Sequence, residues 1–258
     1  MRSLRLRLFA HVAALLFCAG LAGCAAMPHV NRQQSDDPLE PLNRAVFDTN
    51  NALDAALIKP IAESYRAIFP QWARDRFRSV IDNLAEPRIF VNNLLQRRPD
   101  AAGLTFARFF INSIVGVAGM FDLATEQGFA KQSGDFGQTL YTWGVDDGPY
   151  LVLLLVGPSN LRDAFGLGVD VVTTPPALLA GHSHTVANLA VGIVDGIDLR
   201  ARNIETLDEI KSSALDYYAH LKSIMQQRRR AQLLEARGMK DEPYELTDPG
   251  KSADEPKE

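Results

Sequence analysis

Few residues of this sequence combine the types and the spacing that catalysis or metal binding requires. Ser159 lies in a Gly-Pro-Ser-Asn run without the second glycine of a nucleophile elbow, so Ser159 or Asn160 is better explained as the cap of a helix. His182 and His184 are two residues apart, but no third metal ligand is evident, which favours a surface loop. Phosphate-loop, His-Glu-x-x-His and Cys-x-x-Cys motifs are absent. The sequence therefore predicts neither an enzyme nor a bound metal or cofactor.

One residue, Cys24, has a setting that predicts covalent modification. Three arginines within the first seven residues precede an apolar run over residues 8–21, which is the pattern of an export signal. The run is shorter than the roughly 20 residues of a spanning helix. The Leu-Ala-Gly-Cys sequence at 21–24 resembles the lipobox of bacterial lipoproteins, in which the cysteine is acylated and becomes the new N-terminus. Two or more acyl chains would form a stable membrane anchor. The alternative is an ordinary signal peptide with a chance cysteine.

Removal of such a signal peptide changes both the thiol content and the charge of the chain. Cys18 would leave with the signal and Cys24 would carry lipid, so no disulfide or thiolate metal site is expected. The net charge of −4 becomes −7 once three arginines are lost. The acidic, proline-containing end of the chain is expected to be disordered. Because the remaining body is mildly acidic, nucleic acid is not an expected partner.

A narrow polar stripe is predicted on an otherwise apolar helix between Ala101 and Met120. Thr105, Arg108 and Asn112 follow one another at i, i+3 and i+7, so they share one helix face. Such a stripe could line a polar path through apolar surroundings. The alternative is that Arg108 pairs with a carboxylate and holds two helices together.

Other segments also show helical spacing. Apolar residues from Trp72 to Leu84 form one predicted core face, and a second face runs from Ile204 to Met225, with Gly238 as a stop. The apolar run over residues 149–158 fits a short helix or strand. Since the mature chain lacks a long uncharged apolar segment, it is expected to lie within one membrane leaflet rather than to cross the bilayer.

Blocks of residues between Asp37 and Arg230 form a recognisable series. In order they are DPLEPLNR (37–44), NLAEP (83–87), VNNLLQ (91–96), RFFINS (108–113), DFGQTL (135–140), WGV (143–145), GPY (148–150), GPS (157–159), RD (162–163) and SALDYY (213–218). Together these blocks resemble the MlaA/VacJ lipoproteins. The chain departs from the family pattern at Leu154, where a proline is expected, so the bend at that point is uncertain.

This resemblance implies a fold, a place and a role. It implies a mainly α, ring-like single helical domain lying in one leaflet, with an amphipathic channel. The stripe of Thr105, Arg108 and Asn112 could line this channel for a lipid headgroup. The protein would be anchored on the periplasmic side of the outer membrane, an assignment that Ala25 also favours. It would remove misplaced phospholipid from the outer leaflet and so maintain lipid asymmetry. Its partners would be phospholipid, a porin trimer and a soluble periplasmic lipid carrier.

The expected segments are a signal peptide (1–23), a lipidated linker (24–36), a helical domain (37–238) and a disordered acidic tail (239–258). Two other functions fit the sequence less well. One is a passive scaffold of the envelope, and the other is a membrane lipid hydrolase or acyltransferase. Direction and energy source of transport, the porin involved and the position of a gate do not follow from the sequence.

Overall fold

The structure, a computed structural model, describes residues 37–173 and 184–239. Residues beyond Asp37 belong to one compact unit, Pro38–Glu258. The expected lipidation site Cys24, His182 and nearly all of the acidic tail lie outside the described residues, so the predictions about them stay predictions. None of the described helices is long and apolar enough to cross a membrane.

The described part of the chain is mainly helical, as predicted. A π-helical turn, η2 (Asp54–Ile58), joins α2 to α3, and one two-stranded antiparallel sheet is present. The α-helices are α2 (Glu40–Leu53), α3 (Lys59–Ile68), α4 (Gln71–Leu95), α5 (Pro99–Ile114), α6 (Leu123–Glu126), α7 (Phe136–Thr142), α8 (Leu161–Thr173), α10 (His184–Arg202), α11 (Ile204–Ser213) and α12 (Tyr217–Ala236). The strands are β1 (Tyr150–Leu153) and β2 (Gly157–Asn160).

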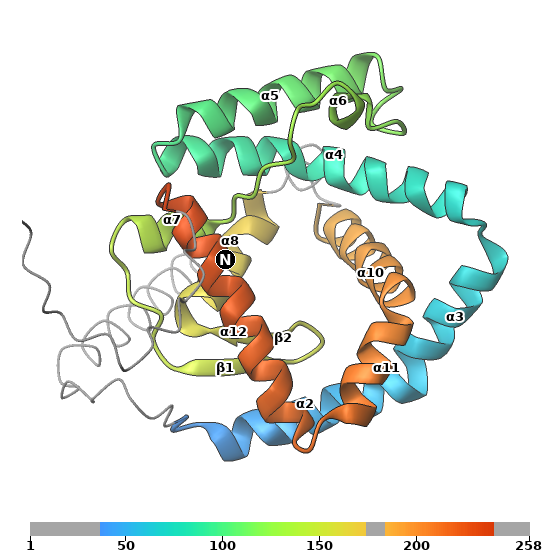
Figure 1. Cartoon of the computed structure of the whole chain (residues 1–258), viewed down its shortest axis with the longest axis vertical. Helices are drawn as coiled ribbons and strands as arrows, with labels where there is room; N and C mark the ends of the chain where they lie inside the picture. Colours follow the sequence, from blue (N-terminus) through green and yellow to red (C-terminus); the bar gives the residue numbers. More distant parts are fainter. Residues whose placement is uncertain (1–36, 174–183, 240–258) are drawn as a thin grey trace, which may run out of the picture. The chain divides into compact units, whose positions relative to one another are not determined.

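Contacts between these elements close a ring within the Pro38–Glu258 unit (Figure 1). The N-terminal helices lead through α3 into α4, which packs on α5 and on α7. From α7 the circuit continues to α8 and α12, and α8 meets the hairpin. Strand β1 then contacts α2, where the circuit began, while α10 packs against α3 and α4. The predicted ring-like helical domain is therefore confirmed.

Side-chain caps fix several helix boundaries. The side chain of Asn160 accepts a hydrogen bond from the Asp163 N–H at 2.8 Å, which confirms the predicted cap before α8. Gly238 has φ +71° just after α12, which confirms it as a stop. The prediction of a single helix from Ile204 through Met225 was wrong, because α11 ends at Ser213. There Asp216 caps α12 by accepting from the Ala219 N–H, so a second helix begins.

The apolar run over residues 149–158 forms a β-hairpin, in which Leu153 pairs with Gly157 across the turn. Two asparagines of α2 hold it. Asn43 bonds with both ends of its amide to the backbone of Tyr150 and Val152, at 3.0 and 2.9 Å. Asn50, two helical turns later, makes the same pair of bonds beside the hairpin tip. A helix side chain therefore satisfies the backbone groups that a third strand would otherwise pair.

The hairpin tip consists of exposed apolar residues, Leu154, Leu155 and Val156. Leu155 has φ +64°, a left-handed conformation that is uncommon for a non-glycine residue. The bend here is therefore formed without the proline that the family pattern led us to expect at Leu154.

The distribution of polar and apolar side chains is the reverse of that in a soluble domain: many polar side chains are buried and many apolar ones are exposed. Among the described residues, the eight largest fully buried side chains are all polar or charged: Arg108, Gln138, Glu86, Asn43, Asn93, Thr105, Thr139 and Asp198. Large apolar side chains are exposed along α4, α5, α8, α10 and the hairpin. A small aromatic core of Phe47, Val152 and Tyr218 joins α2, β1 and α12. Monomeric soluble proteins rarely expose large apolar patches, so exposed apolar side chains on this many elements are unusual for them.

Helix α4 shows the reversal most directly. Its predicted core face included Trp72 and Phe77, and both are exposed, so that prediction was wrong. Its buried residues are instead Asn83, Glu86, Ile89, Asn92 and Asn93. The apolar spacing correctly predicted a helix. The apolar face, however, is turned away from the protein interior, and the polar face is buried in it.

Candidate functional site

Arg108 is the centre of a buried polar cluster that joins α4, α5 and α6. Its Nε donates to Glu86 of α4 at 2.9 Å, and both side chains are only 1% exposed. Its Nη1 donates to the hydroxyl of Thr125 at 2.9 Å and to the carbonyl of Phe129 at 2.7 Å. Its Nη2 reaches both carboxylate oxygens of Asp122 at 3.2 Å. Every arm of the guanidinium is therefore used within the protein.

Asp122 completes this cluster from the turn after α5. It accepts hydrogen bonds from the Asn112 amide at 2.9 Å and from the backbone N–H and hydroxyl of Thr125, and it caps α6. Burial alone would raise the pKa of Asp122, but the hydrogen bonds from Thr125, Asn112 and Arg108 outweigh it and lower this pKa to about 2. Burial raises the pKa of Glu86, and Arg108 only partly offsets that effect.

The three residues of the predicted polar stripe lie together on α5 and are almost fully buried: Thr105 at 0%, Arg108 at 1% and Asn112 at 4%. Thr105 donates to the Ala101 carbonyl of its own helix. Asn112 bonds to Asp122 and accepts from the Ala124 N–H. The alternative considered for Arg108, a pair with a carboxylate that holds two helices together, is the arrangement found. A role in lining a lipid path stays a prediction.

A second polar cluster lies where α4, α7 and α8 meet. Asn92 of α4 accepts from the Thr139 hydroxyl at 2.8 Å and donates to Asp170 of α8 at 3.2 Å. Arg88 pairs with Asp170 at 3.0 Å, and Gln96 donates to Thr139. Sequence reasoning did not select these residues. Their polar types at helical spacing within an apolar segment were the signal that could have found them.

Arg229 of α12 connects the same region to the C-terminal arm. Its guanidinium bonds to both oxygens of Asp135 at 2.7 and 2.9 Å and to both oxygens of Asp163 at 2.8 and 2.9 Å. Burial would raise the pKa of Asp135, but the hydrogen bonds and charge of Arg229 outweigh it, so this pKa is lowered. One arginine thus ties α12 to the start of α7 and to α8.

Helix α8 presents two faces of opposite character. Its buried face consists of Arg162, Gly166 and Asp170, at steps of four residues. Gly166 packs so closely on Gly137 of α7 that an added Cβ would lie 2.4 Å from the Gly137 nitrogen. The polar and small face is therefore directed at protein, and apolar side chains are left on the other face.

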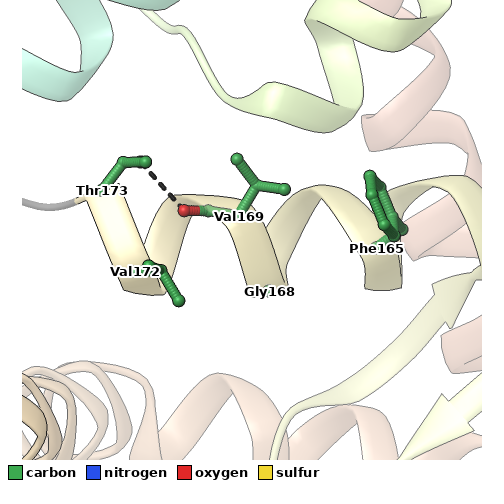
Figure 2. Close-up of a pocket in the computed structure, with 5 residues that line it drawn as sticks. All are labelled: Phe165, Gly168, Val169, Val172 and Thr173. Carbon is green, nitrogen blue, oxygen red and sulfur yellow. Dashed lines mark hydrogen bonds between the residues drawn. The ribbon is translucent and has the colours of Figure 1, made fainter. Parts of the chain in front are cut away.

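That other face of α8 lines an open pocket of about 360 Å³ (Figure 2). Phe165, Gly168, Val169, Val172 and Thr173 line it, and the Thr173 hydroxyl is turned to the Val169 carbonyl at 2.9 Å. With the hydroxyl engaged in the helix, the lining is apolar. An open apolar surface formed by one helix face suits contact with a hydrocarbon segment better than binding of a polar ligand.

The described residues contain no group of three or more His, Cys, Asp or Glu side chains arranged to hold a metal. The charged residues that are buried are paired: Arg108 with Glu86, Asp170 with Arg88, Arg162 with Asp163, Asp198 with Arg202 and Arg200 with Asp54. The arrangement can therefore offer an apolar wall and stable polar junctions, which suffice for non-covalent handling of an amphiphile.

Comparisons with known proteins are consistent with this geometry. A family model described as "MlaA lipoprotein" matches residues 35–232. This chain belongs to the MlaA lipoprotein family. All three polar clusters and the α8 pocket lie inside the matched region. MlaA membership was predicted from the sequence blocks and is confirmed.

Individual MlaA relatives are similar over most of their length. The chain is 34% identical over 203 residues to the "intermembrane phospholipid transport system lipoprotein MlaA" of Escherichia coli K12, covering 76% of this chain and 78% of that protein. It is also 34% identical over 197 residues to an uncharacterized protein of Rickettsia bellii, covering 76% of each chain.

A solved structure described as the "structural basis for maintenance of bacterial outer membrane lipid asymmetry" has a similar fold. Its TM-score is 0.68 at 30% identity, and the match covers 77% of this chain and 99% of that one. The ring of helices is thus shared with an experimentally determined member of the same fold.

Proposed function

We propose that this protein is an outer-membrane lipoprotein that removes misplaced phospholipid from the outer leaflet and so maintains lipid asymmetry. Its family membership supports the proposal, since the E. coli relative carries the name of a phospholipid transport lipoprotein. The similar solved structure concerns outer-membrane lipid asymmetry. Phospholipid would be the substrate, passed on without any covalent step.

The structural observation that carries the proposal is the reversed polarity of the described residues. Buried side chains are mainly polar and bonded to one another, while apolar side chains such as Phe106, Phe110 and Ile114 of α5 are more than half exposed. In water, such a surface would be unfavourable by about 25 cal/mol per Å² of apolar area. In hydrocarbon the same surface carries no such cost. A ring that lies in one leaflet therefore matches the distribution, since no described helix could span the bilayer.

The ring offers a route for a molecule with a polar head and two apolar tails. Dragging the head alone through hydrocarbon is slow, because polar groups lose their hydrogen bonds there. The apolar face of α8 would hold an acyl segment, while the head stays near polar groups. The stripe of Thr105, Arg108 and Asn112 primarily stabilises the wall of this route.

The anchor and the partners complete the proposal. Acyl chains on Cys24 would hold the ring at the periplasmic side of the outer membrane. A porin trimer would surround or support the ring, and a soluble periplasmic carrier would accept the lipid. The family resemblance supports these partners.

A deletion strain tests the proposal. Without the gene, phospholipid should accumulate in the outer leaflet and detergent sensitivity should rise. Wild-type protein on a plasmid should reverse both effects. A Cys24→Ser form that restores both as a free soluble protein would refute the anchored mechanism.

Two further measurements separate the alternative roles. Incubation of the purified protein with phospholipid micelles should release no fatty acid, whereas release would indicate a hydrolase. A passive scaffold predicts altered envelope structure without surface phospholipid, so electron microscopy of the deletion strain together with outer-leaflet labelling distinguishes scaffold from transporter.

A further inference from the structure

The corner between α3 and α4 exposes large apolar side chains on a bent segment. Phe69 has an extended backbone, as is favoured before a proline, and Pro70 starts α4. Ile68 is 70% exposed and Trp72 is 68% exposed. Phe69 packs edge-on against Phe77, with ring centroids 5.5 Å apart. The bend therefore presents a connected aromatic and aliphatic surface rather than scattered side chains.

A second segment extends this surface. Arg76 of α4 donates to the Met120 carbonyl at 3.2 Å, and its guanidinium lies 4.4 Å from the centre of the Phe121 ring. The turn that contains these residues also exposes Val117, whose φ of +54° is strained for a β-branched residue. Gly119 stabilises the turn by packing closely on Asn83. We call the surface formed by Ile68, Phe69, Trp72, Phe77, Val117, Met120 and Phe121 the corner patch.

Positive charge accompanies the corner patch in a chain whose net charge is −4. Residues 59–78 contain five Lys or Arg and two Asp or Glu. Arg66 and Arg78 are paired with Glu205 and Asp195. In the described ranges, 37–173 and 184–239, no carboxylate lies within ion-pair distance of Arg74 or Arg76. Arg76, whose guanidinium lies over the exposed Phe121 ring, is thus left without an acidic partner there, whereas the Nε of Arg74 is buried.

Aromatic rings and arginines side by side suit one environment, the headgroup region of a phospholipid bilayer. Trp is enriched where hydrocarbon meets water, and arginine binds phosphate through its planar fork of donors. Anionic lipids attract basic side chains with about 1 kcal/mol each. We propose that the corner patch docks the ring on an anionic bilayer interface, with Trp72 at the headgroup level and Arg76 on a lipid phosphate. This inference rests on the membrane location in the proposed function.

Tryptophan fluorescence tests the docking, because the chain has two Trp residues, Trp72 and Trp143. Trp143→Phe leaves Trp72 as the only emitter, and Trp72→Phe leaves the exposed Trp143, whose indole donates to Leu95 at 3.2 Å. Each full-length variant is reconstituted into vesicles with lipids brominated near the headgroup or near the chain end. Trp72 should be quenched more strongly by the shallow bromines.

The outcomes separate this inference from the proposed function. If Trp143 is quenched and Trp72 is not, the ring lies in the membrane but the corner patch faces water or a protein, and the inference fails. Stronger quenching of Trp72 by deep bromines also overturns it, because the residue would then lie in hydrocarbon. If neither residue is quenched, the membrane location itself fails.

Headgroup charge is tested in the Trp143→Phe background with brominated phosphatidylglycerol and brominated phosphatidylethanolamine at equal fractions. The anionic lipid should quench Trp72 more, with a local enrichment of up to about fivefold for the one arginine at the patch. Arg76→Gln should reduce the preference, and Arg228→Gln on the exposed side of α12 should leave it unchanged. Equal quenching by the two lipids in the parent protein would contradict recognition of anionic headgroups.

Discussion

At the scale of single residues, the buried charges of this protein bond to partners on other segments. Arg108 of α5 contacts Glu86 of α4, Asp122 and Thr125. A buried ion pair does not by itself guarantee a large stabilisation, because both charges lose water. Removal of one partner is different, since the other charge then remains buried and unpaired. The residue-scale predictions below depend on that asymmetry.

Arg108→Ala should lower the free energy of unfolding by about 3–5 kcal/mol, because Glu86 would be left buried without its cation. The measurement is thermal or denaturant unfolding of the protein in detergent. Arg66→Ala is the matched control: Arg66 pairs with the largely exposed Glu205, so the cost should be below about 1 kcal/mol. Equal effects of the two substitutions would show that burial of the Arg108 pair is unimportant.

The lowered pKa of Asp122 predicts an acid-labile junction. Its pKa is about 2 in the folded protein against an ordinary value of 3.8, so ionised Asp122 stabilises the fold at pH values above 3.8. This contribution is lost as the pH falls toward 2. Asp122→Asn should therefore flatten the fall in stability over this pH interval, measured by unfolding at a series of pH values. Asp100→Asn, at an exposed position at the start of α5, should leave the fall unchanged.

At the scale of elements, helices meet through small residues and polar bonds rather than through interlocking apolar side chains. The α7–α8 contact shows this, because Gly137 and Gly166 bring the two backbones together while Arg229 bonds to Asp135 and Asp163 beside them. Small residues permit close approach where apolar burial in lipid gives little driving force for association. The apolar face of α8 is thereby left free to line the pocket.

Two glycines of α8 provide a matched pair of substitutions. Gly166→Ala should destabilise the protein by about 1–3 kcal/mol, because the new methyl group would lie 2.4 Å from the Gly137 nitrogen and force the helices apart. Gly168→Ala has nothing within 4 Å and should gain about 0.5–1 kcal/mol of helix stability. Both are measured by unfolding in detergent. Identical effects would mean that α7 and α8 do not pack this closely.

At the scale of the whole molecule, the ring exposes apolar residues that a soluble domain would bury. Side chains from α2 through α10 contribute to this surface, including Leu42, Phe110 and Ile193. The ring is also held together by polar links between arms distant in sequence, such as Arg200 of α10 with Asp54 of the π-helical turn. Stability and membrane affinity therefore reside in different parts of the molecule.

The protein should consequently require an amphiphilic environment even without the acyl chains proposed on Cys24. The Cys24→Ser form, purified in detergent and then diluted into buffer, should self-associate, because the exposed apolar surface has no other cover. Light scattering or gel filtration measures the association. Addition of phospholipid vesicles should suppress it. A stable monomer in plain buffer would contradict the arrangement of polarity described above.

The sequence was sufficient for the family, the helical class and several boundaries, because caps such as Asn160 and stops such as Gly238 act locally. Three features did not follow from it. The exposure of Trp72 is one of them: helical spacing shows which residues share an apolar face, but not whether that face meets protein or lipid. The break between two helices before Asp216 did not follow from the sequence, because the apolar spacing continues through it. The partners of Arg108 come from segments that only the folded chain brings together, so its role could be stated only as two alternatives.

The reversed polarity also constrains how such a molecule can reach its destination. The folded ring still exposes many large apolar side chains, so its contact with water remains unfavourable after folding. Passage through an aqueous compartment would therefore require a carrier that shields this exposed apolar surface, and the acyl chains proposed on Cys24 would add to the area to be shielded. A carrier protein with a broad apolar binding surface would meet this requirement. It would have to transfer the folded protein directly into a membrane.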